Sequence, residues 1–286
     1  MEFKEMGLMS GKTLMLLPGT CCDWQTNFGS VISKLSEKYH LICVNYDGFD
    51  GSDTIFPDII TVTEKIEKYI IDHHDGRVDG AIGSSLGSSF VGQLIQRKNI
   101  HIDHGIFGSP DLDQSGKFLA KLQAKLVVPL LAGFSGSEKK RKRSKKLLMK
   151  IFLMKDETAE KFISCFEKFN PQSIKNEYYT DLITYLDNDI NVENTRAHFI
   201  YANKMGEKYL KRYNKYFHNP DIREFNMTSE EFAFALLDAQ SVAVVPGTAF
   251  GDCGEGFLRI SYAYSLEQLK TAMGRIALFI EGLRNK

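Results

Sequence analysis

The composition of this sequence excludes several classes of function but does not identify one. The 36 basic residues are balanced by 36 acidic ones, so no overall charge favours nucleic acid or a membrane surface. The five cysteines are an odd number and form no Cys-x-x-Cys pair or Cys/His cluster. That pattern excludes an obvious zinc site and an obvious disulfide framework. We therefore expect no metal and a reducing, cytoplasmic location.

Long apolar runs are also absent. The first 17 residues contain neither the long apolar segment nor the small-residue cleavage site of a signal peptide. Elsewhere no apolar run is long enough to cross a bilayer. We expect a protein without an integral membrane segment that acts on a small molecule, with nucleic acid excluded as a partner. The sequence leaves the oligomeric state open.

Short apolar runs that end in glycine-rich turns alternate with amphipathic stretches. This alternation predicts an α/β fold with a mainly parallel sheet buried on both faces. Between about residues 112 and 193 the pattern becomes helical, which predicts a helical cap inserted between strands. The runs that predict strands lie within 12–20, 39–53, 78–84, 102–114, 196–206 and 221–227.

A basic run, "KKRKRSKK" at 139–146, lies in the predicted cap. Such a run is compatible with nuclear localisation or with anion binding. Because it continues into "LLMKIFLMK", it also predicts a basic amphipathic helix that touches lipid headgroups or an acidic substrate. A solvated cap face is the simplest alternative.

The five residues from Gly83 to Gly87 read G-S-S-L-G and fit the pattern G-x-S-x-G. They follow the apolar run "VDGAI" and precede the helical stretch "SSFVGQLIQ". In that context the pattern is typical of a nucleophile elbow, a tight strand-to-helix turn that exposes a serine hydroxyl. We predict that Ser85 is the nucleophile and that Gly83 and Gly87 relieve clashes in the turn. A glycine-rich turn without catalysis is the alternative.

With this motif, and with "LLPGT" after the first core strand, residues 10 to 227 resemble the α/β-hydrolase superfamily. The resemblance implies an oxyanion hole, a pair of backbone N–H groups that stabilise the charge of the tetrahedral intermediate. One N–H belongs to Leu86, and the other belongs to Thr20 or Cys21. A simple strand-ending turn is the alternative interpretation of "PGT".

The same resemblance implies an acid and a histidine that activate the serine. The acid is expected after the strand at 196–203, where Asn203 cannot carry a charge and Glu207 is a possible substitute. Asp111, after the preceding strand, is the other candidate. For both carboxylates a solvated loop residue or helix cap is the alternative.

The histidine is expected after the final strand, but no histidine follows residue 218. Without an imidazole base, a serine hydroxyl keeps its proton at neutral pH and is a poor nucleophile. We therefore predict an incomplete triad. The seven histidines, all interpreted as structural or solvent-exposed, are His40, His73, His74, His101, His104, His198 and His218.

From Thr228 onward the sequence changes character. The stretch "VAVVPGTAFGDCGEGFLRISYA" resembles the small C-terminal domain of fold-type I, pyridoxal-phosphate-dependent aminotransferases. The resemblance implies that Arg259 grips a substrate carboxylate, although no stretch resembles the Schiff-base lysine site and the cofactor-binding domain has no counterpart. We therefore expect no cofactor, with pyridoxal phosphate only if the tail were functional, and an orphaned or simply surface-exposed Arg259.

Local signals in this tail predict helices. Thr228 with Glu231 forms a capping box, and Ser265 with Gln268 forms a second cap. A small core is predicted from apolar spacing, and its members are Val242, Val244, Phe250, Phe257, Ile260, Leu269, Met273 and Ile276.

The predicted organisation is a hydrolase core of residues 1–111 and 194–227, a helical cap of residues 112–193, and an aminotransferase-like fragment of residues 228–286. The predicted function is a serine hydrolase of the esterase or acyl-hydrolase type, impaired by the loss of its histidine at the join. The alternatives are a non-catalytic fusion or binding protein and a pyridoxal-phosphate enzyme.

Overall fold

The computed structural model covers the whole chain of 286 residues. It describes all residues except Ser109, Asp111, Asp113 and the ranges 133–136, 153–155, 157–162, 164–168, 201–206, 224–226, 251–257, 261–263 and 285–286. The chain divides into two compact units, one of residues 1–201 and 207–222 and the other of residues 202–206 and 223–286. We call them the body and the tail.

The body contains a seven-stranded sheet with the order β1-β3-β2-β4-β5-β6-β7. The strands β3, β2, β4, β5 and β6 are parallel, whereas the edge strand β1 is antiparallel to β3. The predicted α/β class with a mainly parallel sheet is confirmed. The strands are Glu2–Gly7, Lys12–Leu17, Tyr39–Asn45, Arg77–Ser84, His101–Gly108, Arg196–Ile200 and Asp221–Arg223, from β1 to β7.

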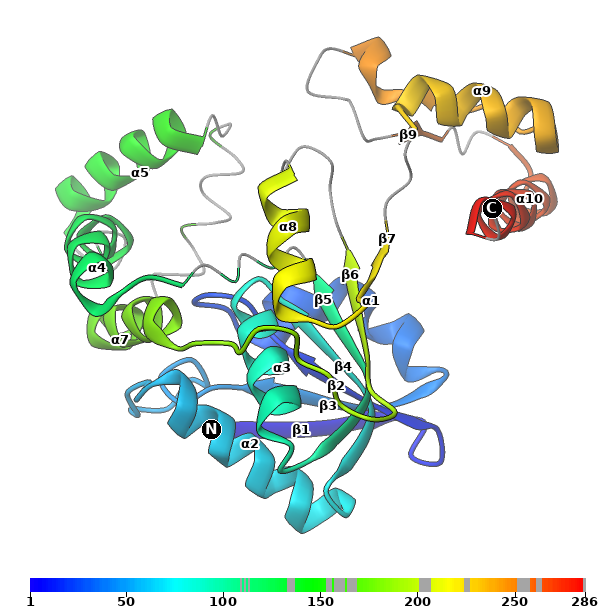
Figure 1. Cartoon of the computed structure of the whole chain (residues 1–286). Helices are drawn as coiled ribbons and strands as arrows, with labels where there is room; N and C mark the ends of the chain where they lie inside the picture. The colour runs from blue at the N-terminus through cyan, green and yellow to red at the C-terminus, as the bar shows by residue number, and fades with distance from the viewer. Residues whose placement is uncertain are drawn as a thin grey trace. The chain divides into compact units, whose positions relative to one another are not determined.

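Helices cover both faces of the sheet (Figure 1). Helix α1 (Trp24–Ser36) covers the face formed by β2 and β3. Helices α2 (Ile59–His74), α3 (Leu86–Arg97) and α8 (Glu207–Tyr216) belong to the opposite face. There Phe107 of β5 stacks on Phe199 of β6, which in turn stacks on Tyr213 of α8.

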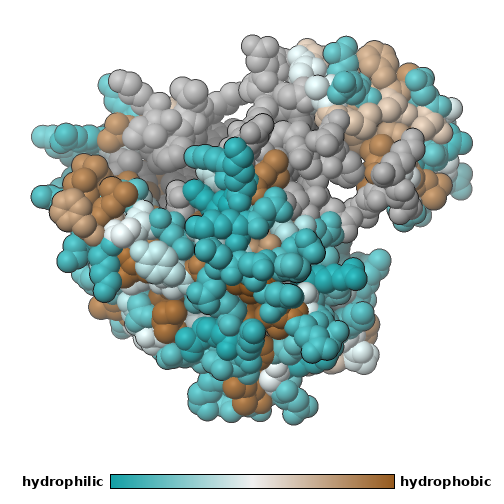
Figure 2. Space-filling view, in the orientation of Figure 1, coloured by the Kyte–Doolittle hydropathy of each residue, from teal (hydrophilic) through white to brown (hydrophobic). Residues whose placement is uncertain are grey.

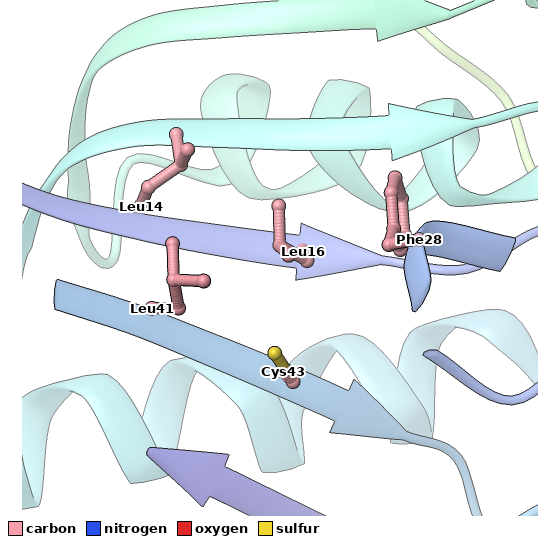
Figure 3. Close-up of a cluster of buried hydrophobic side chains, with 5 residues drawn as sticks. All are labelled: Leu14, Leu16, Phe28, Leu41 and Cys43. Atoms are coloured by element: carbon pink, nitrogen blue, oxygen red, sulfur yellow. The ribbon is translucent and has the colours of Figure 1, made fainter. Parts of the chain in front are cut away.

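The core beneath α1 shows why these short strands are stable. Leu14 and Leu16 of β2 alternate toward this face and meet Phe28, Leu41 and Cys43 (Figure 3). All five side chains are buried, and each large apolar side chain removed from water contributes about 1.5–3 kcal/mol. Burial raises the pKa of the Cys43 thiol to about 12, so this cysteine is a core residue without nucleophilic character.

The cap consists of α4 (Lys117–Ala132), α5 (Glu138–Phe152) and α7 (Pro171–Ile183) in the part of the chain that is described. Helix α7 packs against α4 and is fastened to the body by polar groups on one side. The backbone N–H of Phe56 donates to Ser173 Oγ at 3.1 Å, and Asn176 Nδ2 donates to the Phe56 carbonyl at 2.8 Å. These bonds fix the face that α7 presents to the body.

The tail has its own small core. It contains α9 (Ser229–Gln240), a two-stranded antiparallel sheet of β8 (Val245–Pro246) and β9 (Leu258–Arg259), the 3-10 turn η3 (Gly247–Phe250) and α10 (Leu266–Arg284). The capping box of Thr228 and Glu231 and the cap formed by Ser265 and Gln268 are confirmed. The buried apolar cluster consists of Leu236, Val242, Ile276 and Phe279.

The predicted tail core is only partly right. Val242 and Ile276 are buried, whereas Ile260 and Met273 are exposed by 44% and 53%. Both were chosen from spacing alone, but Ile260 follows the short strand β9, and Met273 lies on a side of α10 that faces water, as do Leu266 and Leu278. Phe257 lies outside the described residues, and nothing is said of the Phe250 side chain.

One difference from the predicted elements concerns an edge of the sheet. Strand β1 was not predicted, because its alternating charged and apolar residues form an exposed edge rather than a buried run. The last strand was predicted over residues 221–227; β7 spans Asp221–Arg223, and residues 224–226 lie outside the described part of the chain. Among the described residues, no helix has the length and apolar character needed to span a bilayer.

Candidate active site

Ser85 sits in a tight turn between β4 and α3. Its backbone has φ 49° and ψ −114°, a conformation that is strained for any residue other than glycine. The turn is held by the Ser85 N–H, which donates to the Gly108 carbonyl of the neighbouring strand at 2.8 Å. Ser85 is exposed, whereas the following residues Leu86, Gly87 and Ser88 are buried. The strand and helix therefore present this one side chain at the carboxyl edge of the sheet.

The two flanking glycines are required by close backbone approaches. A Cβ on Gly83 would lie 2.3 Å from the Gly87 carbonyl oxygen, and one on Gly87 would lie 2.0 Å from the Leu17 carbonyl oxygen. Both distances are far below van der Waals contact. The glycines of the motif thus let β2, β4 and α3 meet at Ser85.

The loop after β2 passes directly beside the nucleophile position. A Cβ on Gly19 would lie 3.4 Å from Ser85 Cβ. The Gly19 N–H donates to Asn27 Oδ1 at 2.6 Å, and Asn27 Nδ2 donates to Ser84 Oγ at 3.2 Å. These bonds tie the loop to the elbow, so the predicted proximity of the "PGT" loop and Ser85 is present.

The predicted oxyanion donors have different environments. Leu86 is the first residue of α3, so its N–H has no acceptor within the helix and lies where the helix dipole is positive. Thr20 lies in the loop next to Gly19 and is partly buried. The Cys21 N–H, by contrast, donates to the carboxyl group of Glu177, at 3.1 Å from Oε2 and 3.3 Å from Oε1. This pairing argues against Cys21 as an oxyanion donor and favours Thr20.

Glu177 is the main residue of this region that the sequence did not reveal. It is 1% exposed, and Cys21 Sγ lies 3.2 Å from its Oε2. Desolvation raises the pKa of Glu177 to about 8, despite the hydrogen bonds from Cys21, which lower it. The only available signal was that Ser173, Asn176 and Glu177 recur at helical spacing, and that spacing does not say which body residues they meet.

The two carboxylates predicted as the triad acid are not placed by this structure. Asp111 lies outside the described residues. Glu207 begins α8, and its side chain is not described. Neither candidate is therefore favoured over the other by geometry, and both stay predictions.

All seven histidines are described, and each has a partner elsewhere in the body. His40 and His74 bind Glu5, and His73 contacts the Tyr69 carbonyl. His101 Nε2 lies 3.0 Å from Asp103 Oδ1 without hydrogen-bond geometry, and His218 Nδ1 lies 2.8 Å from Asp189 Oδ1. Each of these imidazole rings therefore contacts a group other than Ser85.

His104 and His198 form a chain that ends on a carboxylate. His104 Nδ1 lies 3.0 Å from His198 Nε2, and His198 Nδ1 lies 2.9 Å from Asp221 Oδ2. His198 pairs through Ile106 with Ile82, about 10 Å along the strands from Ser85 at 3.3 Å per residue. His198 thus has a carboxylate partner, as a catalytic histidine does, but it lies on a face of the sheet and not at the carboxyl edge where Ser85 lies.

Arg259, the predicted carboxylate-binding residue of the tail, lies on β9 opposite Val245 and is exposed. The lysines of the tail are Lys204, Lys270 and Lys286, and the one that the structure describes, Lys270, is exposed on α10. Among the described residues, no group of three or more His, Cys, Asp or Glu side chains is arranged to hold a metal.

The body has the fold of α/β hydrolases. The chain is similar to the putative α/β-hydrolase family protein of Desulfitobacterium hafniense, with a TM-score of 0.59 and 16% identity over 78% of this chain and 90% of that one. It is similar to MenH from S. aureus, with a TM-score of 0.57 and 15% identity over 78% of this chain and 87% of that one. At these identities the likeness shows the fold alone, and it confirms the predicted hydrolase-like architecture.

The C-terminal part of the chain is similar to aminotransferases. The profile of the family "Aminotransferase class I and II" matches residues 157–276. The chain is 51% identical over 61 residues to a putative aminotransferase, YugH, of Bacillus subtilis, and 52% identical over 63 residues to an aspartate aminotransferase of Pyrococcus horikoshii. These matches cover 21% and 22% of this chain and 16% of each relative.

The chain thus joins a hydrolase-like body to an aminotransferase-like C-terminal segment, and this double resemblance is confirmed. It spans about a sixth of the length of those two aminotransferase relatives. The family match begins at residue 157, well before the predicted join at Met227 and Thr228. The position of the join therefore stays a prediction.

Proposed function

We propose that the body is a serine hydrolase of the esterase or acyl-hydrolase type in which Ser85 is the nucleophile. The observation that carries the proposal is the strained, exposed Ser85 between two glycines that permit backbone contact with β2. Such a turn is costly, since a positive φ at a non-glycine residue destabilises the fold by about 1–3 kcal/mol. Asp75 and Lys98 also have a positive φ, but they are left-handed helix ends with ψ 30° and 18°, whereas Ser85 has ψ −114°, and this outlier supports a functional role for its side chain.

In the proposed reaction, Ser85 Oγ attacks the carbonyl carbon of a small ester or acyl substrate and releases its proton to water. The bond to the leaving alcohol then breaks, and the alcohol takes up a proton. A water molecule hydrolyses the resulting acyl-enzyme, which releases the acid and restores the Ser85 hydroxyl. The N–H groups of Leu86 and Thr20 stabilise the negative charge on the carbonyl oxygen. Each donor of this kind contributes about 3–4 kcal/mol to stabilising the transition state. The loop that carries Thr20 is held beside Ser85 by Gly19 and Asn27.

The proposed enzyme is slow because Ser85 has no histidine as its base. No histidine follows residue 218, and the seven that exist bind other groups. A serine hydrolase without a working triad retains about 10³–10⁴-fold catalysis over water from binding and the oxyanion hole. A carboxylate at Asp111 or Glu207 has no imidazole to orient, so neither is expected to raise the rate.

Among the residues of the tail that the structure describes, none forms a site that fits pyridoxal phosphate. Capture of that cofactor as a Schiff base needs a lysine within a walled pocket, whereas Lys270 is exposed on α10 and Arg259 is exposed on β9. We derive no step through the cofactor. The proposed location is cytoplasmic, and the support for it is the odd number of cysteines without a Cys-x-x-Cys pair.

The test is hydrolysis of p-nitrophenyl acetate by the full chain, with Ser85→Ala and with Ser33→Ala, an exposed serine of α1, as the matched control. We expect slow turnover that Ser85→Ala removes and Ser33→Ala retains. Added imidazole should accelerate the wild-type chain more than Ser85→Ala, because it supplies the missing base.

Equal turnover in all three proteins would rule out Ser85 as the nucleophile and leave a non-catalytic hydrolase fold as the better description. Turnover as fast as in an intact serine esterase, without added imidazole, would instead show that another group serves as the base. Either result is distinct from the expected slow, imidazole-stimulated reaction.

A further inference from the structure

The cap concentrates positive charge in an otherwise neutral chain. Residues 117–152 contain nine lysines, two arginines and one glutamate, a net charge of +10. Since the whole chain has a net charge of zero, the remainder carries −10. This asymmetry orients the molecule in the field of an anionic surface, with α4 and α5 facing that surface.

Helix α4 is apolar on two opposite sides. One side, with Ala120, Ala124, Val128 and Leu131, is buried. The other carries Phe118, Leu122 and Leu126 at i, i+4 and i+8, exposed by 85%, 48% and 71%. Packing among the described residues of the cap buries only the first side, and the exposure of the second side to water is unfavourable.

Basic residues border the exposed apolar side. Lys117, Lys121 and Lys125 have the same i, i+4, i+8 spacing, because each immediately precedes one of the exposed apolar residues in the sequence. Helix α5, which contacts α4, adds exposed Lys139, Lys140, Lys142, Arg143 and Lys146. Figure 2 shows the resulting arrangement, a brown cluster over α4 at the left of the view with teal side chains around it.

A cavity of about 540 Å³ lies between α4 and α7. Ala124, Val128 and Pro129 provide apolar lining, and Lys121, Lys125 and Lys175 provide ammonium groups. Apolar walls combined with positive charges match a molecule that has an acyl chain and an anionic head. The cavity therefore adds a second feature with the chemistry of the exposed side of α4.

We propose that the α4–α5 face of the cap is a docking surface for membranes that contain anionic lipids. The apolar side chains enter the headgroup region, and the lysines and arginines bind lipid phosphates, as in other interfacial basic amphipathic helices. The chain lies on the bilayer in this arrangement and does not span it. Nucleic acids and acidic proteins are negatively charged, as anionic lipids are, but they offer no apolar layer for Phe118 and Leu126.

The test is co-sedimentation of the full chain with vesicles of phosphatidylcholine alone and of phosphatidylcholine with about a third phosphatidylglycerol. We expect binding to the anionic vesicles only, and a steep decrease with added salt because screening weakens the attraction. Two variant sets separate the two contributions. Phe118→Ser with Leu126→Ser removes apolar contacts without changing charge, and Lys139→Glu with Lys140→Glu reverses charge on α5.

Each set should weaken binding tenfold or more. The matched control, Lys34→Glu with Lys38→Glu in and next to α1, makes the same charge change at exposed positions outside the cap and should retain wild-type binding. Far-ultraviolet circular dichroism checks that each variant is folded, and both sets change exposed side chains only.

Equal binding to neutral and anionic vesicles, or unchanged binding in both variant sets, would overturn the proposal. So would binding to polyuridylic acid that matches vesicle binding and is unaffected by Phe118→Ser with Leu126→Ser. That last result would assign the face to a polyanion and leave the apolar side chains without a role in it.

Discussion

Glu177 of α7 accepts the backbone N–H of Cys21, at 3.1 Å from its Oε2, in the loop that leads from β2 toward Ser85. The cap is thereby linked to the edge of the candidate active site through a buried carboxyl group. Desolvation is the main reason that the pKa of Glu177 is raised to about 8. Since this pKa lies above neutral pH, the carboxyl group is protonated near pH 7. The linkage has consequences for stability.

The pH dependence of stability follows from this pKa. The folded chain holds the Glu177 proton up to about pH 8, whereas an unfolded chain releases it near the ordinary value of 4.5. Between these values the folded state binds more protons, so the contribution of Glu177 to stability falls as pH rises and is fully lost above pH 8. We expect Glu177→Gln, which keeps an acceptor for Cys21, to unfold at a higher urea concentration than wild type at pH 9. Equal midpoints at pH 9 would show that Glu177 does not titrate in this range.

Fluorescence of Trp24 gives a suitable measurement for such experiments. It is the only tryptophan in the chain and lies in α1, so its signal reports unfolding of the body. The transition of the body is thus followed without contributions from the tail, whose unfolding need not coincide with it.

The glycines of the elbow should tolerate no side chain. Gly87→Ala places a Cβ 2.0 Å from the Leu17 carbonyl oxygen, and backbone must move to relieve it. We expect a loss of stability of at least about 3 kcal/mol, or no folded protein. Gly29→Ala in α1 is the control, since no atom lies within 4 Å of its new Cβ and alanine favours a helix by up to about 1 kcal/mol. A Gly87→Ala variant as stable as wild type would show that Gly87 does not make this close approach to the Leu17 carbonyl oxygen.

Reactivity of Ser85 toward a fluorophosphonate probe should be slow. The probe needs a serine with increased nucleophilicity, and an elbow without an imidazole supplies only the oxyanion donors. We expect labelling of the full chain that is lost in Ser85→Ala and is at least about a thousandfold slower than for an intact serine esterase. Labelling at the rate of an intact esterase would contradict the incomplete triad.

A buried ion pair between α2 and α3 should contribute more than an exposed pair. Arg97 Nε donates to Glu67 Oε1 at 2.7 Å, and the Glu67 side chain is only 5% exposed. Arg97→Gln leaves this carboxylate without its charged partner and should cost about 3 kcal/mol. Lys68→Gln, which breaks an exposed pair with Asp72, should change stability by less than about 0.5 kcal/mol. Equal urea midpoints for the two variants would show that Glu67 is adequately solvated without Arg97.

The tail should open more readily than the body. In the part of the tail that the structure describes, the buried cluster is small (Leu236, Val242, Ile276 and Phe279), and a piece of this size is marginal on its own. We expect amides of α9 and α10 to exchange with solvent faster than those of β2, β4 and β5, as measured by hydrogen–deuterium exchange with mass spectrometry. Equal protection in the two units would show that the tail gains stability from another source.

The sequence by itself determined the elements that depend on local pattern. Buried parallel strands are continuous apolar runs, so β2, β3, β4 and β5 were recognisable, and the capping box at Thr228 follows from two residues three positions apart. The G-x-S-x-G spacing located Ser85, because the steric demands of the elbow act between neighbouring residues. The edge strand β1 was missed, since an exposed edge has no apolar run to reveal it.

Tertiary structure alone decided which distant groups meet. Glu177 and Cys21 are 156 positions apart, and His104 and His198 are 94 apart. No local pattern specifies such pairs, because they depend on how a cap helix docks and on which strands become neighbours in the sheet. For the same reason the sequence marked the apolar residues of α4 without showing which side is buried against the cap and which faces water.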